Sequence, residues 1–229
     1  MTEGSLPAAV LEANLAIVRQ GLVLSTFGNV SGIDRQAGRI HIKPSGVPYD
    51  TLFVEDIVEC DLEGRALGNR LRPSSDILTH AVLYAAFPAI GAVVHTHSTY
   101  ATIMAQAMRP IPAFGTTHAD YFHGTIPVTR RLAANEVGAD YVANTGRVIV
   151  EAFDGLDPLA IPAVLVAGHG PFAWGRDTTE AVHNAVVLEE VARMAWHALT
   201  IAPNLQPISQ ALLDRHYLRK HGAAATYGQ

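Results

Sequence analysis

The sequence predicts one domain of mixed α/β or α+β class, spanning residues 1–229. Of its 229 residues, 49% are hydrophobic, enough for a large buried core in a chain of this length. Segments with helical and strand-like patterns are mixed throughout the chain. No Pro-, Gly- or Ser-rich stretch separates one part of the chain from another, so we expect a single domain.

The expected helices are recognised by apolar residues that repeat about every 3.6 positions. We expect the first over residues 6–20, with Ser5 as its N-cap. The clearest spans 178–201, where Asp177 and Glu180 fit a capping box. Its apolar stripe comprises Ala181, Ala185, Leu188, Ala192, Ala195 and Leu199. Further helices are expected from Ser74 or Ser75 to Pro88, from Ser98 to before Pro110, and over 206–221.

The expected strands are short. Residues 40–43 and 92–97 have strand-like composition, and 162–170 read as a buried strand that enters a loop. Residues 111–130 are expected to form strand and turn. By β propensity alone, 147–153 also favours a strand.

The charge balance restricts the classes of partner. Lys and Arg total 16 against 21 Asp and Glu, so the basic excess of a nucleic-acid-binding protein is missing. The sequence has no run of about 18 apolar residues, so we expect no membrane span. A single cysteine, Cys60, and a start unlike a signal peptide predict a cytoplasmic protein.

The motif His95-Thr96-His97 closes an apolar strand and is the sharpest chemical signal. Residues i and i+2 of a strand share a face, so both imidazoles could bind one metal ion. The alternative is two polar residues at a strand end. A third ligand could come from His169, which lies between two glycines, or from Asp76. A carboxylate at a helix N-terminus explains Asp76 equally well.

Three short turns could hold a phosphate group: Gly28-Asn29, Lys43-Pro44-Ser45-Gly46 and Ser74-Ser75. They offer hydroxyls, free backbone amides and one cation, although turns in general are rich in these residues. Asp120 and Tyr227 are further polar candidates, and both also fit ordinary surface positions.

Taken together, these motifs resemble the class II aldolase/adducin superfamily and, within it, the L-ribulose-5-phosphate 4-epimerases. The match is collinear from about residue 8 to 229. It includes TFGNVSGID (26–34), IKPSGVPYD (42–50), RPSSDILTH (72–80), VVHTHS (93–98), GTTHADYFHGTIP (115–127), HGPFAWG (169–175), AVHNAVVLEEVA (181–192) and LLDRHYLRKHGAAATYGQ (212–229). The resemblance implies a three-layer αβα sandwich around a mainly antiparallel sheet. It also implies a helix near 147–153, and we prefer that expectation to the strand.

The resemblance also implies roles for individual residues. His95, His97 and His169 match the zinc ligands, with Asp76 counted among them; Mn²⁺ or Co²⁺ could replace Zn²⁺. Asp120 and Tyr227 match the two acid/base groups. The implied substrate-binding residues are Gly28, Asn29, Lys43, Ser45, Gly46, Ser74, Ser75, Thr116, His216 and Arg219, the last two reaching a neighbouring subunit's site. The implied assembly is a cyclic homotetramer with active sites between subunits. The chain departs from the usual pattern at Gly168, Asn144 and His123.

The implied activity is interconversion of L-ribulose 5-phosphate and D-xylulose 5-phosphate. The C4 hydrogen of such a ketose is not acidic, so cleavage and re-formation of the C3–C4 bond is the accessible route. A metal would act as a Lewis acid, and one proton-transfer group is needed on each side of the bond.

Two alternatives remain. A class II sugar-phosphate aldolase, such as one acting on L-fuculose phosphate, would release the two fragments. A non-catalytic adducin-like domain would need no metal, and the three histidines argue against it.

Overall fold

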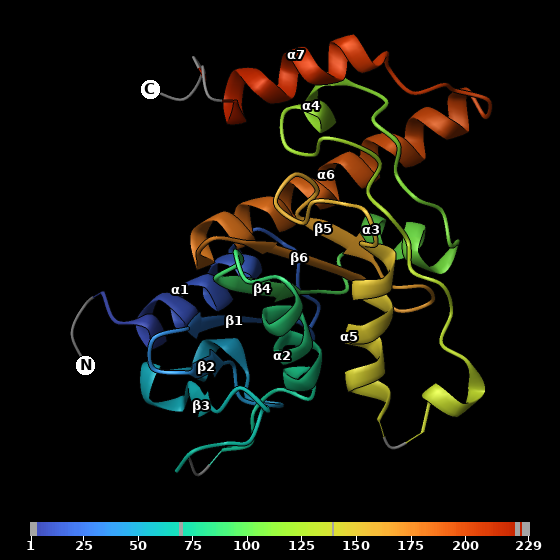
Figure 1. Ribbon diagram of the computed structural model, residues 1–229. Helices are drawn as coiled ribbons and strands as arrows, with labels where there is room; N and C mark the ends of the chain where they lie inside the picture. Colours follow the sequence, from blue (N-terminus) through green and yellow to red (C-terminus); the bar gives the residue numbers. More distant parts are fainter. Residues whose placement is uncertain (1–3, 69–70, 139, 223–224, 226–229) are drawn as a thin grey trace.

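The computed structural model describes residues 4–68, 71–138, 140–222 and 225 (Figure 1). Its strands are β1 (Asn29–Asp34), β2 (Arg39–Ile42), β3 (Val58–Cys60), β4 (Ala92–His95), β5 (Ala163–Leu165) and β6 (Pro171–Gly175). Its α-helices are α1 (Leu6–Arg19), α2 (Ile77–Ala86), α3 (Thr99–Gln106), α4 (Thr116–Ala119), α5 (Tyr141–Ala152), α6 (Thr178–Ile201) and α7 (Gln210–His221). Short 3₁₀ turns occur at Tyr49–Thr51, Val54–Asp56 and Ala134–Glu136.

The six strands form one sheet in the order β3-β2-β1-β4-β6-β5, and every neighbouring pair is antiparallel. Helices α1 and α6 pack on one face, with α3 against α6, and α2 and α5 lie together on the other (Figure 1). Trp174 of β6 is buried between Phe87, after α2, and Phe153, after α5. The expected α/β class with a mainly antiparallel sheet is therefore confirmed.

Two expected helices agree closely with the structure, although their caps differ in detail. Helix α6 spans Thr178–Ile201, and the Asp177 carboxylate accepts the backbone N–H of Glu180 at 2.8 Å. The Glu180 carboxylate bonds the backbone N–H of Arg176 instead of closing a reciprocal box on Asp177. Helix α1 follows Ser5, whose side chain makes no capping bond. Within the described ranges, no helix has the length and apolar character needed to span a membrane.

The helix that the resemblance implies near 147–153 is confirmed, and the strand indicated by β propensity alone is not: these residues lie in and just after α5, which packs against α2. A Cβ on Gly146 would come within 2.7 Å of Val82, so the small residue permits close contact between the two helices. Other local expectations were wrong. The segment 111–130 contains the short helix α4 and takes part in two isolated bridges, Ile111–Ile126 and Val128–Leu165, rather than forming a regular strand. Asp76, not Ser74 or Ser75, is the N-cap residue of α2.

Candidate active site

The site begins where three adjacent strands place one residue each side by side. In the sheet register, His95 of the central strand β4 pairs with Asn29 of β1 and with Phe172 of β6. Paired residues in neighbouring strands project from the same face, and this is the face that α2 and α5 cover. The Phe172 ring stacks on His95 with a centroid distance of 4.2 Å, which fixes the imidazole from one side.

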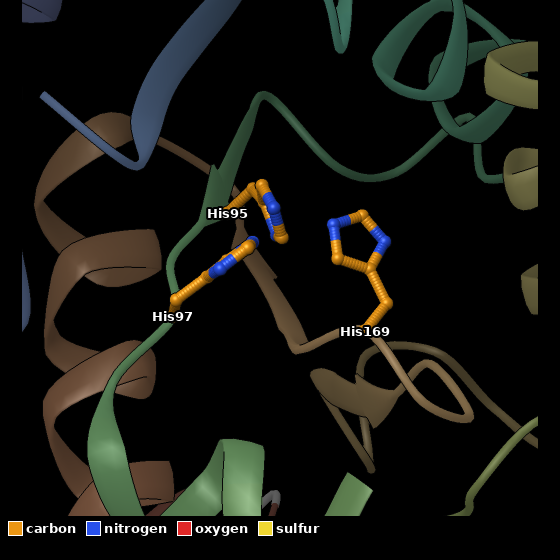
Figure 2. Close-up of side chains that lie close together, drawn as sticks. All are labelled: His95, His97 and His169. Atoms are coloured by element: carbon orange, nitrogen blue, oxygen red, sulfur yellow. The ribbon is translucent and has the colours of Figure 1, made fainter. Parts of the chain in front are cut away.

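Three imidazoles meet at this point and form the histidine cluster His95, His97 and His169 (Figure 2). Their ring centroids are 4.8–5.1 Å apart, and one ligand atom from each lies within 4.8 Å of the others. Three nitrogens this close can bind a single divalent ion.

The cluster arises differently from the geometry expected from the sequence. Strand β4 ends at His95, so His97 lies beyond the strand and the shared-face argument does not apply to it. His169 lies in the hairpin between β5 and β6. Gly170 lets this hairpin approach closely, since a Cβ there would lie 2.8 Å from the carbonyl oxygen of Thr96. The glycine beside His169 therefore serves the close approach expected from the sequence.

The protonation states suit metal binding. Burial is the largest effect lowering the pKa of His95, and it also lowers the pKa of His169 to about 4. Both imidazoles are therefore neutral near pH 7, as ligands must be. His95 Nδ1–H donates to the carbonyl of Pro171 at 2.9 Å, which leaves Nε2 with a free lone pair. His169 Nδ1 is buried and has no hydrogen-bond partner among the described residues. The donor set therefore fits a divalent metal.

Asp76 lies beside this cluster and is held by Asn29. The Asn29 side-chain amide donates to the Asp76 carboxylate at 2.7 Å and to the Ser74 hydroxyl at 2.9 Å. Burial alone would raise the pKa of Asp76, but nearby His95 and His80 and the Asn29 bond hold it below its ordinary value. Asp76 is therefore an oriented carboxylate at the edge of the cluster.

These groups line one pocket of about 480 Å³, a size typical of small-molecule sites. It gathers the candidates from all three expected phosphate turns: Gly28, Asn29, Lys43, Ser45, Gly46, Ser74 and Ser75. The Lys43 ammonium donates to the carbonyl of Val47 at 2.7 Å and lies 4.6 Å from the Tyr49 ring centroid. Burial lowers the pKa of Lys43 to about 8. The Lys43 ammonium also donates to the carbonyl of Pro44, so it lies against the turn that contains Ser45 and Gly46.

The expected acid/base region lies apart from the lining of this pocket. Helices α4 and α7 lie together at the end of the molecule away from β1–β3 (Figure 1). Asp120, just after α4, accepts hydrogen bonds from His216 and Arg219 of α7, each at 3.0 Å. Thr116 is exposed at the start of α4. The other expected acid/base group, Tyr227, lies outside the described residues.

Some pocket residues were missed from the sequence. Phe27, which precedes the Gly28-Asn29 turn, stacks on His97 at a centroid distance of 5.8 Å. Tyr141 and Val142 enter the pocket from the start of α5. Phe27 lies within a recognised motif and could have been included. Tyr141 had no such signal, because it depends on where α5 begins.

Comparisons with known proteins agree with this architecture. Two curated relatives named L-ribulose-5-phosphate 4-epimerase UlaF, from Salmonella paratyphi A and Salmonella typhi, are each 56% identical over 220 residues, covering 96% of both chains. A solved L-fuculose 1-phosphate aldolase has a TM-score of 0.79 at 23% identity, covering 94% of this chain and 96% of that one. Another, from Glaciozyma antarctica PI12, has a TM-score of 0.75 at 17% identity, covering 95% and 84%. These two likenesses show the fold. The model of the Class II Aldolase and Adducin N-terminal domain matches residues 8–196. The chain therefore belongs to the class II aldolase and adducin family.

Proposed function

We propose that this protein is a metal-dependent epimerase that interconverts L-ribulose 5-phosphate and D-xylulose 5-phosphate. The observation that carries the proposal is the 56% identity, over 96% of both chains, to proteins named for this epimerisation. The pocket supports it, because the histidine cluster and three turns suited to phosphate line one cavity.

We propose Zn²⁺ as the metal, with Mn²⁺ or Co²⁺ as possible substitutes. His95, His97 and His169 would hold it, with the Asp76 carboxylate as an additional ligand or neighbour. Once bound, such an ion supplies Lewis-acid polarisation of the ketose oxygens. No thiolate is available to it in this pocket lining, and an all-histidine set leaves coordination positions open for substrate.

The phosphate group would bind at the turns that line the same pocket. Ser45, Gly46, Ser74 and Ser75 offer hydroxyls and backbone amides, with Lys43 close behind as a positive charge. A firm hold on the phosphate matters in an epimerase, because the fragment that carries it must rotate and rejoin instead of leaving.

The remaining chemistry is proton transfer. Cleavage of C3–C4 gives the enediolate of dihydroxyacetone and glycolaldehyde phosphate, and the bond re-forms on the other face of the aldehyde. We assign the two transfers to Asp120 and Tyr227. Since Asp120 is not among the residues lining the pocket of its own chain, we propose a homotetramer in which neighbouring subunits complete each site. His216 and Arg219 would orient Asp120 there, and Thr116 would contact substrate.

An aldolase is the competing function, because a solved L-fuculose 1-phosphate aldolase shares the fold. One assay separates the two. Purified protein is incubated with L-ribulose 5-phosphate, with and without added Zn²⁺, Mn²⁺ or Co²⁺. We expect D-xylulose 5-phosphate to form without free glycolaldehyde phosphate, and chelation to stop the reaction. Accumulation of the free aldehyde would support the aldolase, and absence of any turnover would reject both.

A further inference from the structure

The helix that follows the histidine pair is capped by a residue from a distant part of the chain. Helix α3 begins at Thr99, and its N-cap residue Ser98 makes no side-chain capping bond. The carboxylate of Glu189, in α6, caps the helix instead with both of its oxygens. They accept the backbone N–H groups of Tyr100 at 2.8 Å and Ala101 at 2.9 Å. A carboxylate at this position satisfies two otherwise unpaired amides and suits the positive end of the helix dipole.

The two histidines of the pair differ in how their backbone is held. His95 belongs to β4 and is fixed by pairing on both sides, with β1 and β6. His97 lies beyond β4 and two residues before α3. It is more exposed than His95, and its ring contact with Phe27 does not hold the backbone. The position of His97 therefore depends on where the first turn of α3 is fastened.

We propose that Glu189 is a positioning residue for the metal centre, because it fastens the first turn of α3 to α6 and so sets the placement of His97. The rest of the α3–α6 contact does not replace this link. Tyr100 has ring contacts with Trp196 and His197 at 6.1 and 5.9 Å, but these hold a side chain and not the N-terminal amides. The inference rests on the proposed metal-binding function of the histidine cluster.

The test compares metal binding by the folded wild type with that of three variants. Zn²⁺ affinity is measured by competition with a chromophoric chelator, and the geometry of the site by the absorption spectrum of Co²⁺. Glu189→Ala removes both acceptors, while Glu189→Gln retains one carbonyl oxygen. Glu190→Ala is the matched control, since Glu190 is the next residue of α6 and pairs with Arg193 on the surface. Thermal unfolding of the metal-free proteins is recorded separately.

We expect Glu189→Ala to bind Zn²⁺ about 10- to 100-fold more weakly, the range typical when a support of a metal ligand is lost. The Co²⁺ spectrum should change, Glu189→Gln should lose less, and Glu190→Ala should match wild type. Should Glu189→Ala fail to fold, the same comparison is made with Glu189→Gln.

Wild-type affinity in a folded Glu189 variant would overturn the inference, even if its unfolding temperature falls, because the residue would then support only the fold. Equal losses in Glu189→Ala and Glu190→Ala would overturn it too. A wild type that binds no metal would instead reject the proposed metal-dependent function, and the inference with it.

Discussion

The end of β4 and the α4–α7 region hold the two halves of the proposed chemistry in different ways. In the histidine cluster, His95 is fixed by sheet register, by the Phe172 ring and by its hydrogen bond to Pro171, all inside one chain. Asp120 instead follows the short helix α4, where its carboxylate faces His216 and Arg219 of α7 and is not part of the pocket lining. The comparison teaches that, if the proposed function holds, one chain supplies all the groups proposed for metal and phosphate, whereas the proposed proton-transfer groups need the pocket of a second chain.

The largest effect is expected from removal of a ligand in the histidine cluster. In His97→Asn, metal binding and epimerisation should be lost together, with activity reduced on the order of 10³-fold or more, since Lewis-acid stabilisation contributes several kcal/mol. Metal content and turnover are measured on the same preparation. His41→Asn, in β2 and outside the pocket lining, is the control. Full activity in a metal-free His97→Asn preparation would contradict the assignment.

The second effect should fall on the α4–α7 region without disturbing the metal. Asp120→Asn is expected to lower kcat about 10²- to 10⁴-fold, the usual contribution of general acid–base catalysis, while the metal content stays that of wild type. Asp214→Asn tests whether any carboxylate near α4 matters, because Asp214 of α7 pairs with His123, which follows α4. The prediction is wrong if both variants lose activity alike, or if Asp120→Asn loses its metal.

A smaller effect is expected at the phosphate turn. Ser75 is exposed in the pocket lining, so Ser75→Ala should leave the fold intact. Loss of a hydrogen bond to a charged group, worth about 1.5–3 kcal/mol, should raise KM about 10- to 100-fold. Free glycolaldehyde phosphate should become detectable as the fragment escapes. Thr200→Ala, at the exposed end of α6, serves as control. Unchanged KM and no escaping aldehyde would remove Ser75 from the phosphate site.

The smallest effect concerns stability in the α4 region. His118 is buried and donates from Nε2 to the carbonyl of Gly124, yet burial lowers its pKa to about 4. Between about pH 6.5 and 4 the unfolded chain binds a proton there that the folded chain does not, so acidification destabilises the fold by up to about 1.4 kcal/mol per pH unit. In metal-free His118→Gln this part of the slope should disappear from unfolding free energies measured across that pH range. An unchanged slope would show that His118 is not buried neutral.

The sequence identified the chemistry of the histidine cluster better than its geometry. His95, His97 and His169 were expected as ligands because they follow apolar segments or lie between glycines, which are local features. The shared strand face assumed for the pair was wrong, since β4 stops at His95. The cluster forms because the β5–β6 hairpin and the segment after β4 approach each other in three dimensions.

Other differences between sequence and structure have the same origin. Val148, Ile149 and Val150 favour a strand by propensity alone, but packing of α5 on α2 outweighs that preference, and the helix implied by the resemblance is the one found. No strand was expected over β6, whose ends are Pro171 and Gly175, residues typical of turns. The hydrogen bond from Ala101 of α3 to Glu189 joins residues 88 apart in the sequence, and no local sequence pattern predicts such a contact.

The central claim is that the α4–α7 region of one subunit completes the pocket of another, and mixing two inactive variants tests it most directly. Asp120→Asn and Tyr227→Phe are co-assembled in equal amounts, and mixed oligomers are confirmed by mass. If the two groups come from different subunits, about one site in four carries neither lesion, so about a quarter of wild-type activity should return. Activity that stays at the level of the parent variants, in oligomers shown to be mixed, would contradict the shared site.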